Sequence, residues 1–160
     1  MAERDKQLGS SGVFKIIVDS ARKITRALSE SDDGEALPEE AQSVGDKIAQ
    51  AFVANRFADV YEMGTTILKG RSTGYQFTQS WTDAVKGRGP FTGYEVANSG
   101  DIDLQYIPGL ENVHQDALVA FLEIAFSSPD VPVDSEKAFA IGVVLLDEDG
   151  HVGIGAIHAR

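Results

Sequence analysis

The chain has 160 residues, with 14 Lys and Arg against 25 Asp and Glu, and a formal net charge of −11 at pH 7. This acidic balance speaks against binding to nucleic acid or to an anionic membrane surface, since both need a basic face. The hydrophobic share of 42% and the charged share of 24% are typical of a single globular domain. Cysteine is absent, which excludes disulfides, thiolate metal ligands and cysteine nucleophiles.

The first residues lack an apolar run after a basic start, and no stretch approaches 18 consecutive apolar residues. We therefore expect no signal peptide and no membrane span, and a cytoplasmic location.

The first predicted element is an amphipathic helix over residues 12–29, followed by a polar linker, so that residues 1–35 stand apart from a domain over 36–160. Basic residues concentrate in the last turns of this helix, where the helix dipole favours them. The apolar stripe on which the prediction rests has helical spacing and consists of Val13, Ile17, Ala21, Ile24 and Leu28. Residues 1–31 carry six Lys or Arg against four acids, whereas residues 32–160 carry eight against twenty-one. The basic helix is therefore able to dock on the acidic body.

Two more helices are predicted before residue 90. Pro38 and the acids after it begin the first of them, the step at Asn55 and Arg56 kinks or divides it, and Gly64 ends it. Ser72 or Thr73 caps the next helix. Its apolar face consists of Phe77, Trp81 and Val85, and the glycines and proline of residues 86–90 end it.

The second half of the chain changes to the two-residue period of strands. Predicted strands cover residues 91–96, 101–107, 116–127, 138–146 and 151–158, with a tight Asp-Gly turn at 147–150. In the long strand, one face, expected to meet the helices, holds Leu118, Ala120, Leu122, Ile124 and Phe126. The opposite face holds Ala117, Val119, Phe121, Glu123 and Ala125. Sharp bends are expected at Gly142, Gly153 and Gly155.

These elements predict an α+β fold in which N-terminal helices pack on a strongly curved antiparallel sheet of four to five strands. A sheet curled around helices leaves a cavity on its concave face.

The pattern resembles the nuclear transport factor 2-like (cystatin-like) superfamily of α+β cones, and within it the uncharacterised-domain members. The resemblance covers about residues 40–160 and rests on Ile48–Phe52, Phe57–Tyr61, Trp81, Gly89–Phe91 and the closing hairpin Val143–Ile154. It implies a cone-like fold with a cavity, and a homodimer formed through the outer sheet face. Some members are isomerases in which a tyrosine donates to an oxyanion. The helix at 12–29 lies outside the resemblance.

Four residues are the candidate ligand-binding residues of the cavity: Trp81, Tyr106, Phe77 and Leu122. For Trp81, a role as a core anchor is the favoured interpretation. Tyr106 shares a strand face with Ile102 and Leu104, so its ring is expected to point toward the helices. The acids Asp101, Asp103 and Glu123 fall on the opposite faces of their strands, which argues against an isomerase or dehydratase site.

On the outer face, an exposed apolar area around Val119, Phe121, Glu123 and Val144 is expected to form a homodimer interface. His114, His151 and His158 are not spaced as metal ligands, and the Asp101–Asp103 pair lacks the rest of a calcium loop, so no metal is predicted. No phosphate-binding loop is present, and no cofactor is expected.

The leading hypothesis is a non-catalytic binding or assembly protein, homodimeric, whose cavity takes a small apolar ligand or is filled by its own side chains. The first alternative is an isomerase or dehydratase that uses Tyr106. The second is a module that recruits a partner through the 12–29 helix.

Overall fold

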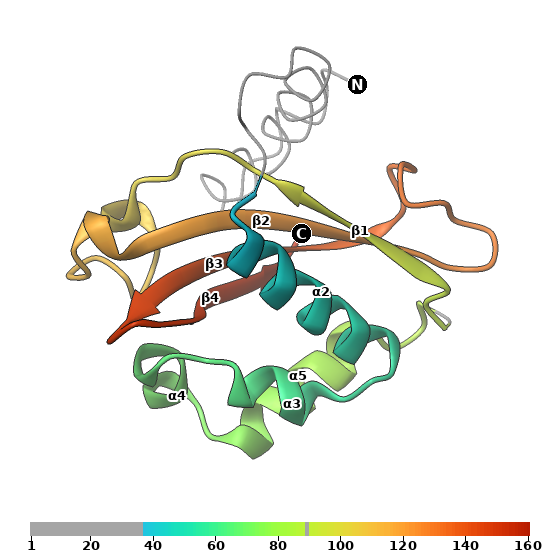
Figure 1. Ribbon diagram of the computed structural model, residues 1–160. Coiled ribbons are helices and arrows are strands. Elements are labelled where there is room, and N and C mark those ends of the chain that lie inside the picture. Colours follow the sequence, from blue (N-terminus) through green and yellow to red (C-terminus); the bar gives the residue numbers. More distant parts are fainter. Residues whose placement is uncertain (1–36, 89) are drawn as a thin grey trace, which may run out of the picture.

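The computed structural model describes residues 37–88 and 90–160. In this part of the chain, four helices precede one antiparallel sheet of four strands in the order β1-β2-β3-β4. The helices lie on one side of the sheet (Figure 1). The predicted α+β class and antiparallel pairing are therefore confirmed. The predicted 12–29 helix and its linker lie outside the described residues.

The helical half consists of α2 (Glu39–Val53), α3 (Phe57–Glu62), α4 (Thr66–Arg71) and α5 (Gly74–Ala84). The predicted break in the helix near residue 55 is confirmed. Asn55 adopts a positive φ of 58°, which is incompatible with a right-handed helix and separates α2 from α3. Thr73 is the N-cap of α5. Its hydroxyl accepts from the Gln76 amide, and the Gln76 side chain accepts from the Thr73 amide, which forms a capping box.

The sheet consists of β1 (Gly93–Asn98), β2 (Leu118–Ser127), β3 (Phe139–Glu148) and β4 (His151–Ala159). The predicted tight turn between the last two strands is confirmed. Asp149 and Gly150 both have positive φ, 55° and 88°, as a type I′ hairpin turn requires. The Asp147 carboxylate accepts from the Gly150 amide at 3.0 Å.

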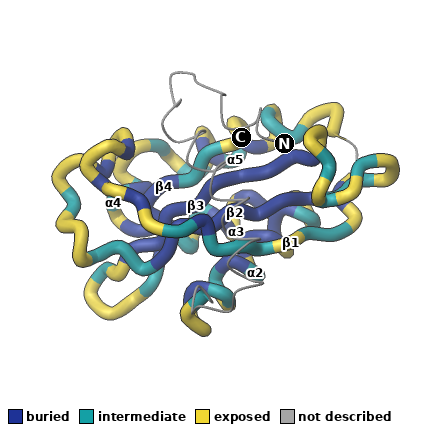
Figure 2. Tube along the Cα trace, turned by 90° about the horizontal axis from the view of Figure 1, so that it is seen from above, coloured by how far each residue is buried: buried dark blue, intermediate teal, exposed yellow. Residues whose placement is uncertain are grey.

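The main core lies between the helices and the sheet, where Figure 2 shows long buried stretches of the central strands. From β2, Ala120, Leu122, Ile124 and Phe126 enter this core, as predicted. The Phe52 ring of α2 lies 5.1 Å from the Trp81 ring and 5.5 Å from the Phe126 ring, measured between centroids. Aromatic side chains thus occupy the centre of the space between the two layers.

The predicted strand at 101–107 is wrong, because this segment belongs to a loop, residues 99–117, that covers one end of the outer face of the sheet. The loop contains two short 3₁₀ helices, η2 (Leu104–Tyr106) and η3 (Gln115–Ala117). The Gln115 side chain holds it by accepting from the Leu104 amide at 2.9 Å and donating to the Ile102 carbonyl at 2.8 Å. Four of its apolar side chains are buried in a second core against β2, β3 and β4: Ile102, Leu104, Ile107 and Leu110.

The strong curvature expected from the strand glycines is also wrong, since the sheet is not strongly curled. Gly155 and Gly153 instead permit close approach by other parts of the chain. A Cβ atom added at Gly155 would lie only 2.4 Å from Leu146 Cδ1, and one at Gly153 would lie 3.1 Å from the Met63 carbonyl oxygen.

Candidate functional site

Three of the four predicted cavity residues lie together, but as parts of the packed core. Phe77 and Trp81 of α5 are 6% and 7% exposed, their ring centroids are 6.4 Å apart, and Leu122 is fully buried in the same cluster. The Tyr61 ring packs on Phe77, and the Phe52 ring on Trp81. These contacts favour the interpretation of Trp81 as a core anchor.

The fourth predicted cavity residue, Tyr106, is not in the interior. It ends η2 and is 65% exposed. The alternation that suggested an inward ring requires a strand, whereas the 3₁₀ turn directs Leu104 and Ile107 inward and leaves Tyr106 outside. The tyrosine on which the isomerase hypothesis depended is therefore separated from the proposed cavity.

The residues predicted to form a dimer face are not exposed as expected. Phe121 and Val144 are fully buried in the second core, and Glu123 is 3% exposed and forms an ion pair with Arg160 at 2.6 Å. Val119 is half-buried and packs on the main core, because the register shifts between Leu118 and Ala120. The prediction that these four side chains are exposed is therefore wrong. The homodimer itself stays a prediction.

The structure brings together a different site, a groove beside the β3–β4 hairpin. The connection between α3 and α4 pairs with β4 at a parallel bridge between Gly64 and Ile154. The Thr65 amide donates to the Ile154 carbonyl, and the Ile154 amide to the Met63 carbonyl, both at 2.9 Å. The Thr65 hydroxyl also donates to the Ile154 carbonyl at 3.0 Å. One wall of the groove is thus tied to the sheet by the backbone.

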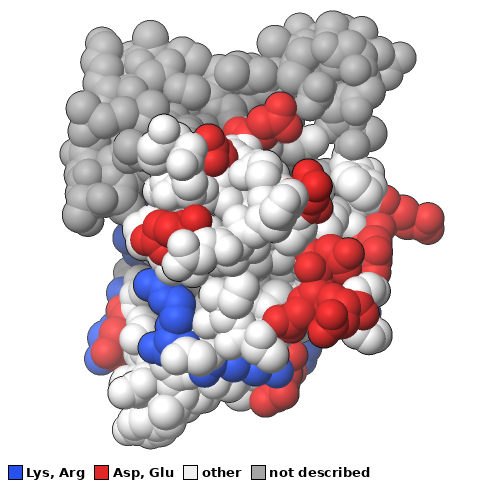
Figure 3. Space-filling view, turned by 90° about the vertical axis from the view of Figure 1, so that its left-hand side faces the viewer, with Lys and Arg blue, Asp and Glu red and all other residues white. Residues whose placement is uncertain are grey.

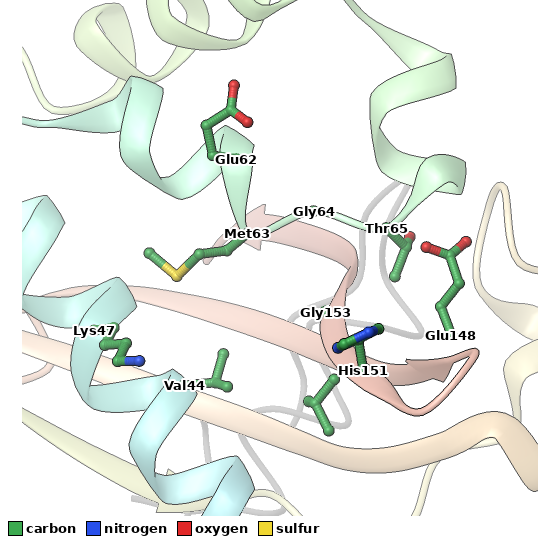
Figure 4. A pocket seen from close by; sticks show the side chains of 10 residues that line it. Val44, Lys47, Glu62, Met63, Gly64, Thr65, Glu148, His151 and Gly153 are labelled. Atoms are coloured by element: carbon green, nitrogen blue, oxygen red, sulfur yellow. The ribbon is translucent and has the colours of Figure 1, made fainter.

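The groove has a volume of about 270 Å³ and lies between α2, the α3–α4 connection and the hairpin. Val44, Met63 and Val152 supply apolar surface and are half-buried. In Figure 4, Met63 extends from its connection toward Lys47 of α2, whereas Glu62 points away from the groove. The groove thus has an apolar floor and polar groups at its margins. This arrangement suits a ligand that has an apolar part and a polar part.

The two carboxylates beside the groove are already engaged. Glu148 accepts from the Thr66 hydroxyl at 2.5 Å and from the Thr66 amide at 3.1 Å, and Glu62 lies 3.6 Å from the Lys69 ammonium. The hydrogen bond from the Thr66 side chain, followed by that from its amide, lowers the pKa of Glu148. Lys47 and His151 form no ion pair with any residue of 37–88 or 90–160. Lys47 is therefore a cation of the groove lining that remains available to a ligand.

Replacing Thr66 by Val is expected to raise the pKa of Glu148 back toward its usual value of 4.5, because the variant loses the largest cause of the shift. A lowered folded pKa means that this contact stabilises the fold above pH 4.5 and that its contribution is lost as the pH falls through the lowered value. NMR titration of the side-chain carboxyl carbon measures the shift. Thr66→Ser keeps the hydroxyl and should keep the low pKa. An unchanged pKa in Thr66→Val would refute the assignment.

Sequence reasoning missed this groove and treated His151 and the acidic turn as ordinary hairpin residues. The groove depends on the bridge between Gly64 and Ile154, which lie 90 positions apart, and no local pattern specifies which residue pairs with which. Gly64 and Gly153 were the only hints, because glycine marks positions where backbone segments approach closely.

Within the described ranges, no group of three or more His, Cys, Asp or Glu residues is arranged to hold a metal ion. None of the helices formed by residues 37–88 and 90–160 has the length and apolar character needed to cross a bilayer.

Comparison of the chain with protein-family models, with curated proteins and with solved structures found no match in any of the three. The resemblance to the nuclear transport factor 2-like superfamily therefore stays a prediction, and the function has to be argued from the residues of this chain.

Proposed function

We propose that the protein is a non-catalytic binding protein that takes a small amphipathic anion in the groove beside the β3–β4 hairpin. The observation that carries the proposal is the groove itself, which half-buried apolar side chains line together with Lys47. The proposal keeps the leading hypothesis of a binding protein and moves its site from the interior to this groove.

Packing in the core supports this choice of site. The Phe52, Trp81 and Phe126 rings occupy the middle of the space between helices and sheet at ring contact distances. A ligand there would have to displace them, whereas Val44, Met63 and Val152 are already partly open to solvent. Binding in the groove therefore requires less rearrangement of the protein.

The charge of the ligand follows from the groups at the margins. The Glu148 carboxylate is bound by Thr66, and Glu62 points away from the groove. Lys47, in contrast, has no ion-pair partner among the described residues and remains available to a ligand. Lys47 presents a strongly hydrated point charge on a long apolar stem, which suits a carboxylate or sulfonate attached to an apolar body. We therefore expect a fatty-acid-like or aromatic carboxylate rather than a neutral or cationic molecule.

We expect Lys47→Glu to weaken binding of 1-anilinonaphthalene-8-sulfonate, an aromatic sulfonate that becomes fluorescent in apolar surroundings, by about tenfold or more. This corresponds to the loss of about 1.4 kcal/mol, within the range for one charge-assisted contact, with added repulsion from the new carboxylate. The measurement is a fluorescence titration of the full chain at low salt.

The matched control is Lys137→Glu, which makes the same change of charge at an exposed residue outside the groove. It should alter the affinity little. Equal loss in both variants would attribute binding to net charge alone, and no loss in Lys47→Glu would exclude the groove as the site.

A further inference from the structure

The outer face of the sheet contains a buried area that neither core explains. Ala125 is 7% exposed, Ala140 is 1% exposed and Gly142 is buried. Ala125 and Ala140 belong to neither of the two hydrophobic clusters that the described residues form. We call these three residues, with Glu123 beside them, the central patch.

The register of the strands places the central patch on one continuous surface. Glu123 pairs with Gly142, which pairs with His158, and in the next row Ala125 pairs with Ala140. Because side chains alternate along a strand, these residues share the face that Phe121 and Val144 occupy one row further on. Burial lowers the pKa of His158, with a smaller effect from the charge of Arg71. The surface is therefore shielded from water on β2 and β3, and partly shielded at His158 on β4.

The 99–117 loop covers only one end of this face. The apolar side chains of the loop pack with four sheet residues: Phe121, Val144, Leu146 and Ala156. These four residues lie next to the central patch but are not part of it. The helices α2 to α5 pack on the opposite face. Arg160 reaches one part of the central patch, where it pairs with Glu123 and its amide donates to the Ala140 carbonyl, but its own side chain is only 9% exposed. A further segment of the chain is therefore needed to cover the patch.

The position at which the described chain begins favours residues 12–29 as the cover. Gly45 of α2 lies against Val96, and the Gln50 side chain donates to the Tyr94 hydroxyl, so α2 runs antiparallel to β1. Its first residues therefore lie toward Asn98, at an edge strand of the described sheet. Seven residues, 30–36, separate the predicted helix from this point and reach about 25 Å when extended. That length is ample to pass around a sheet edge, because packed layers lie about 10 Å apart.

Charge and pattern favour the same segment. Residues 12–29 carry four Lys or Arg and one Asp, whereas residues 37–160 carry eight basic and eighteen acidic residues. Acidic side chains cover more of the face seen in Figure 3 than basic ones do. The predicted helix also has an apolar stripe that needs a surface to pack on, and Ala and Gly residues of a sheet let a helix approach closely.

We propose that residues 12–29 form a helix that docks its apolar stripe on the central patch of its own chain. This docking completes the fold as a sheet covered on both faces, and it occupies a surface that shares Glu123 with the face first considered for a homodimer. The inference is independent of the groove, which lies on the helix side of the sheet.

The test uses the absence of native cysteine, so that any disulfide reports an engineered pair. In the full chain, Ala140→Cys is combined in turn with Ile17→Cys, Ala21→Cys and Ile24→Cys, which lie along the apolar stripe. A disulfide forms only where the two Cβ atoms come within about 4.5 Å. We expect at least one of the three pairs to form an intrachain disulfide as its main product, identified by intact mass and by non-reducing electrophoresis. Ala125→Cys replaces Ala140→Cys if the latter does not fold.

Two controls separate docking from chance collision. Asp19→Cys lies on the polar side of the predicted helix and should not join Ala140→Cys. Ala21→Cys should likewise not join Gln79→Cys, an exposed position on α5 beyond the opposite face of the sheet. Disulfides between two chains would assign the central patch to a second copy and overturn the proposal. So would the absence of any intrachain product from all three pairs, or equal yields in the controls.

Discussion

Replacing Phe52 by Ala is expected to lower the free energy of unfolding by about 3–5 kcal/mol. Phe52 is fully buried, and its ring contacts Phe57, Trp81 and Phe126 at centroid distances of 5.0, 5.1 and 5.5 Å. The variant would leave a cavity among three rings from two helices and a strand, which cannot all move to fill it. Since small domains are stable by about 5–15 kcal/mol, the loss should be evident in urea unfolding.

The control for this prediction is Tyr75→Ala, which removes an aromatic ring that is 77% exposed and should change the stability by no more than about 0.5 kcal/mol. Phe52→Leu, which keeps most of the apolar volume, should lie between the two. If Phe52→Ala were as mild as Tyr75→Ala, the interior would contain room for collapse or for a ligand. The choice of the groove as the binding site assumes that the core is filled by its own side chains, and that assumption would then be wrong.

Replacing Leu110 by Ala is expected to cost about 2–5 kcal/mol, although Leu110 lies in a loop. Leu110 is fully buried in the second core, and its side chain lies near the position where Gly155 has no Cβ. Most loop substitutions are mild because loops lie on the surface with solvated side chains. A large effect here would show that the 99–117 loop is a packed layer on the sheet.

Tyr106→Ala is the matched variant that tests whether residues 101–107 form a loop rather than a strand. The stability of Leu110→Ala and of Tyr106→Ala is measured by urea unfolding. With Tyr106 65% exposed, the loss should stay within about 0.5 kcal/mol. A strand at 101–107 with Tyr106 inside would reverse the order of the two effects. A larger loss in Tyr106→Ala than in Leu110→Ala would therefore restore the strand and, with it, an interior tyrosine.

The prediction failed at 101–107 because two periods coincide there. Ile102 and Leu104 alternate as in a strand, but Leu104, Ile107 and Leu110 also recur every three residues, the period of a 3₁₀ helix. The segment is too short for its pattern to separate the two. The loop conformation is held by the Gln115 side chain, which accepts from the Leu104 amide and donates to the Ile102 carbonyl. A hydrophobicity pattern does not reveal such hydrogen bonds.

The inner face of β2 shows the opposite case, in which the pattern was sufficient. Ala120, Leu122, Ile124 and Phe126 reach the main core as the strict alternation predicts. Leu118 does not, because the register shifts before Ala120 and turns Leu118 into the second core. A bulge of this kind depends on the neighbouring strand, so the end of the alternating run could not be predicted from β2 alone.

The amino-acid sequence by itself determined the α+β order, a kink or division of the helix near Asn55, a helix cap at Ser72 or Thr73, the tight Asp-Gly turn at 147–150, and the inward face of β2 from Ala120 to Phe126. Each depends on residues a few positions apart, whose steric and hydrogen-bonding preferences act locally. The tertiary structure alone decided that the 99–117 loop covers the sheet, that Gly153 and Gly155 admit close contacts instead of bends, and that Lys47 and Met63 meet at one groove. These features join segments tens of residues apart, and their energies come from packing that no local pattern encodes.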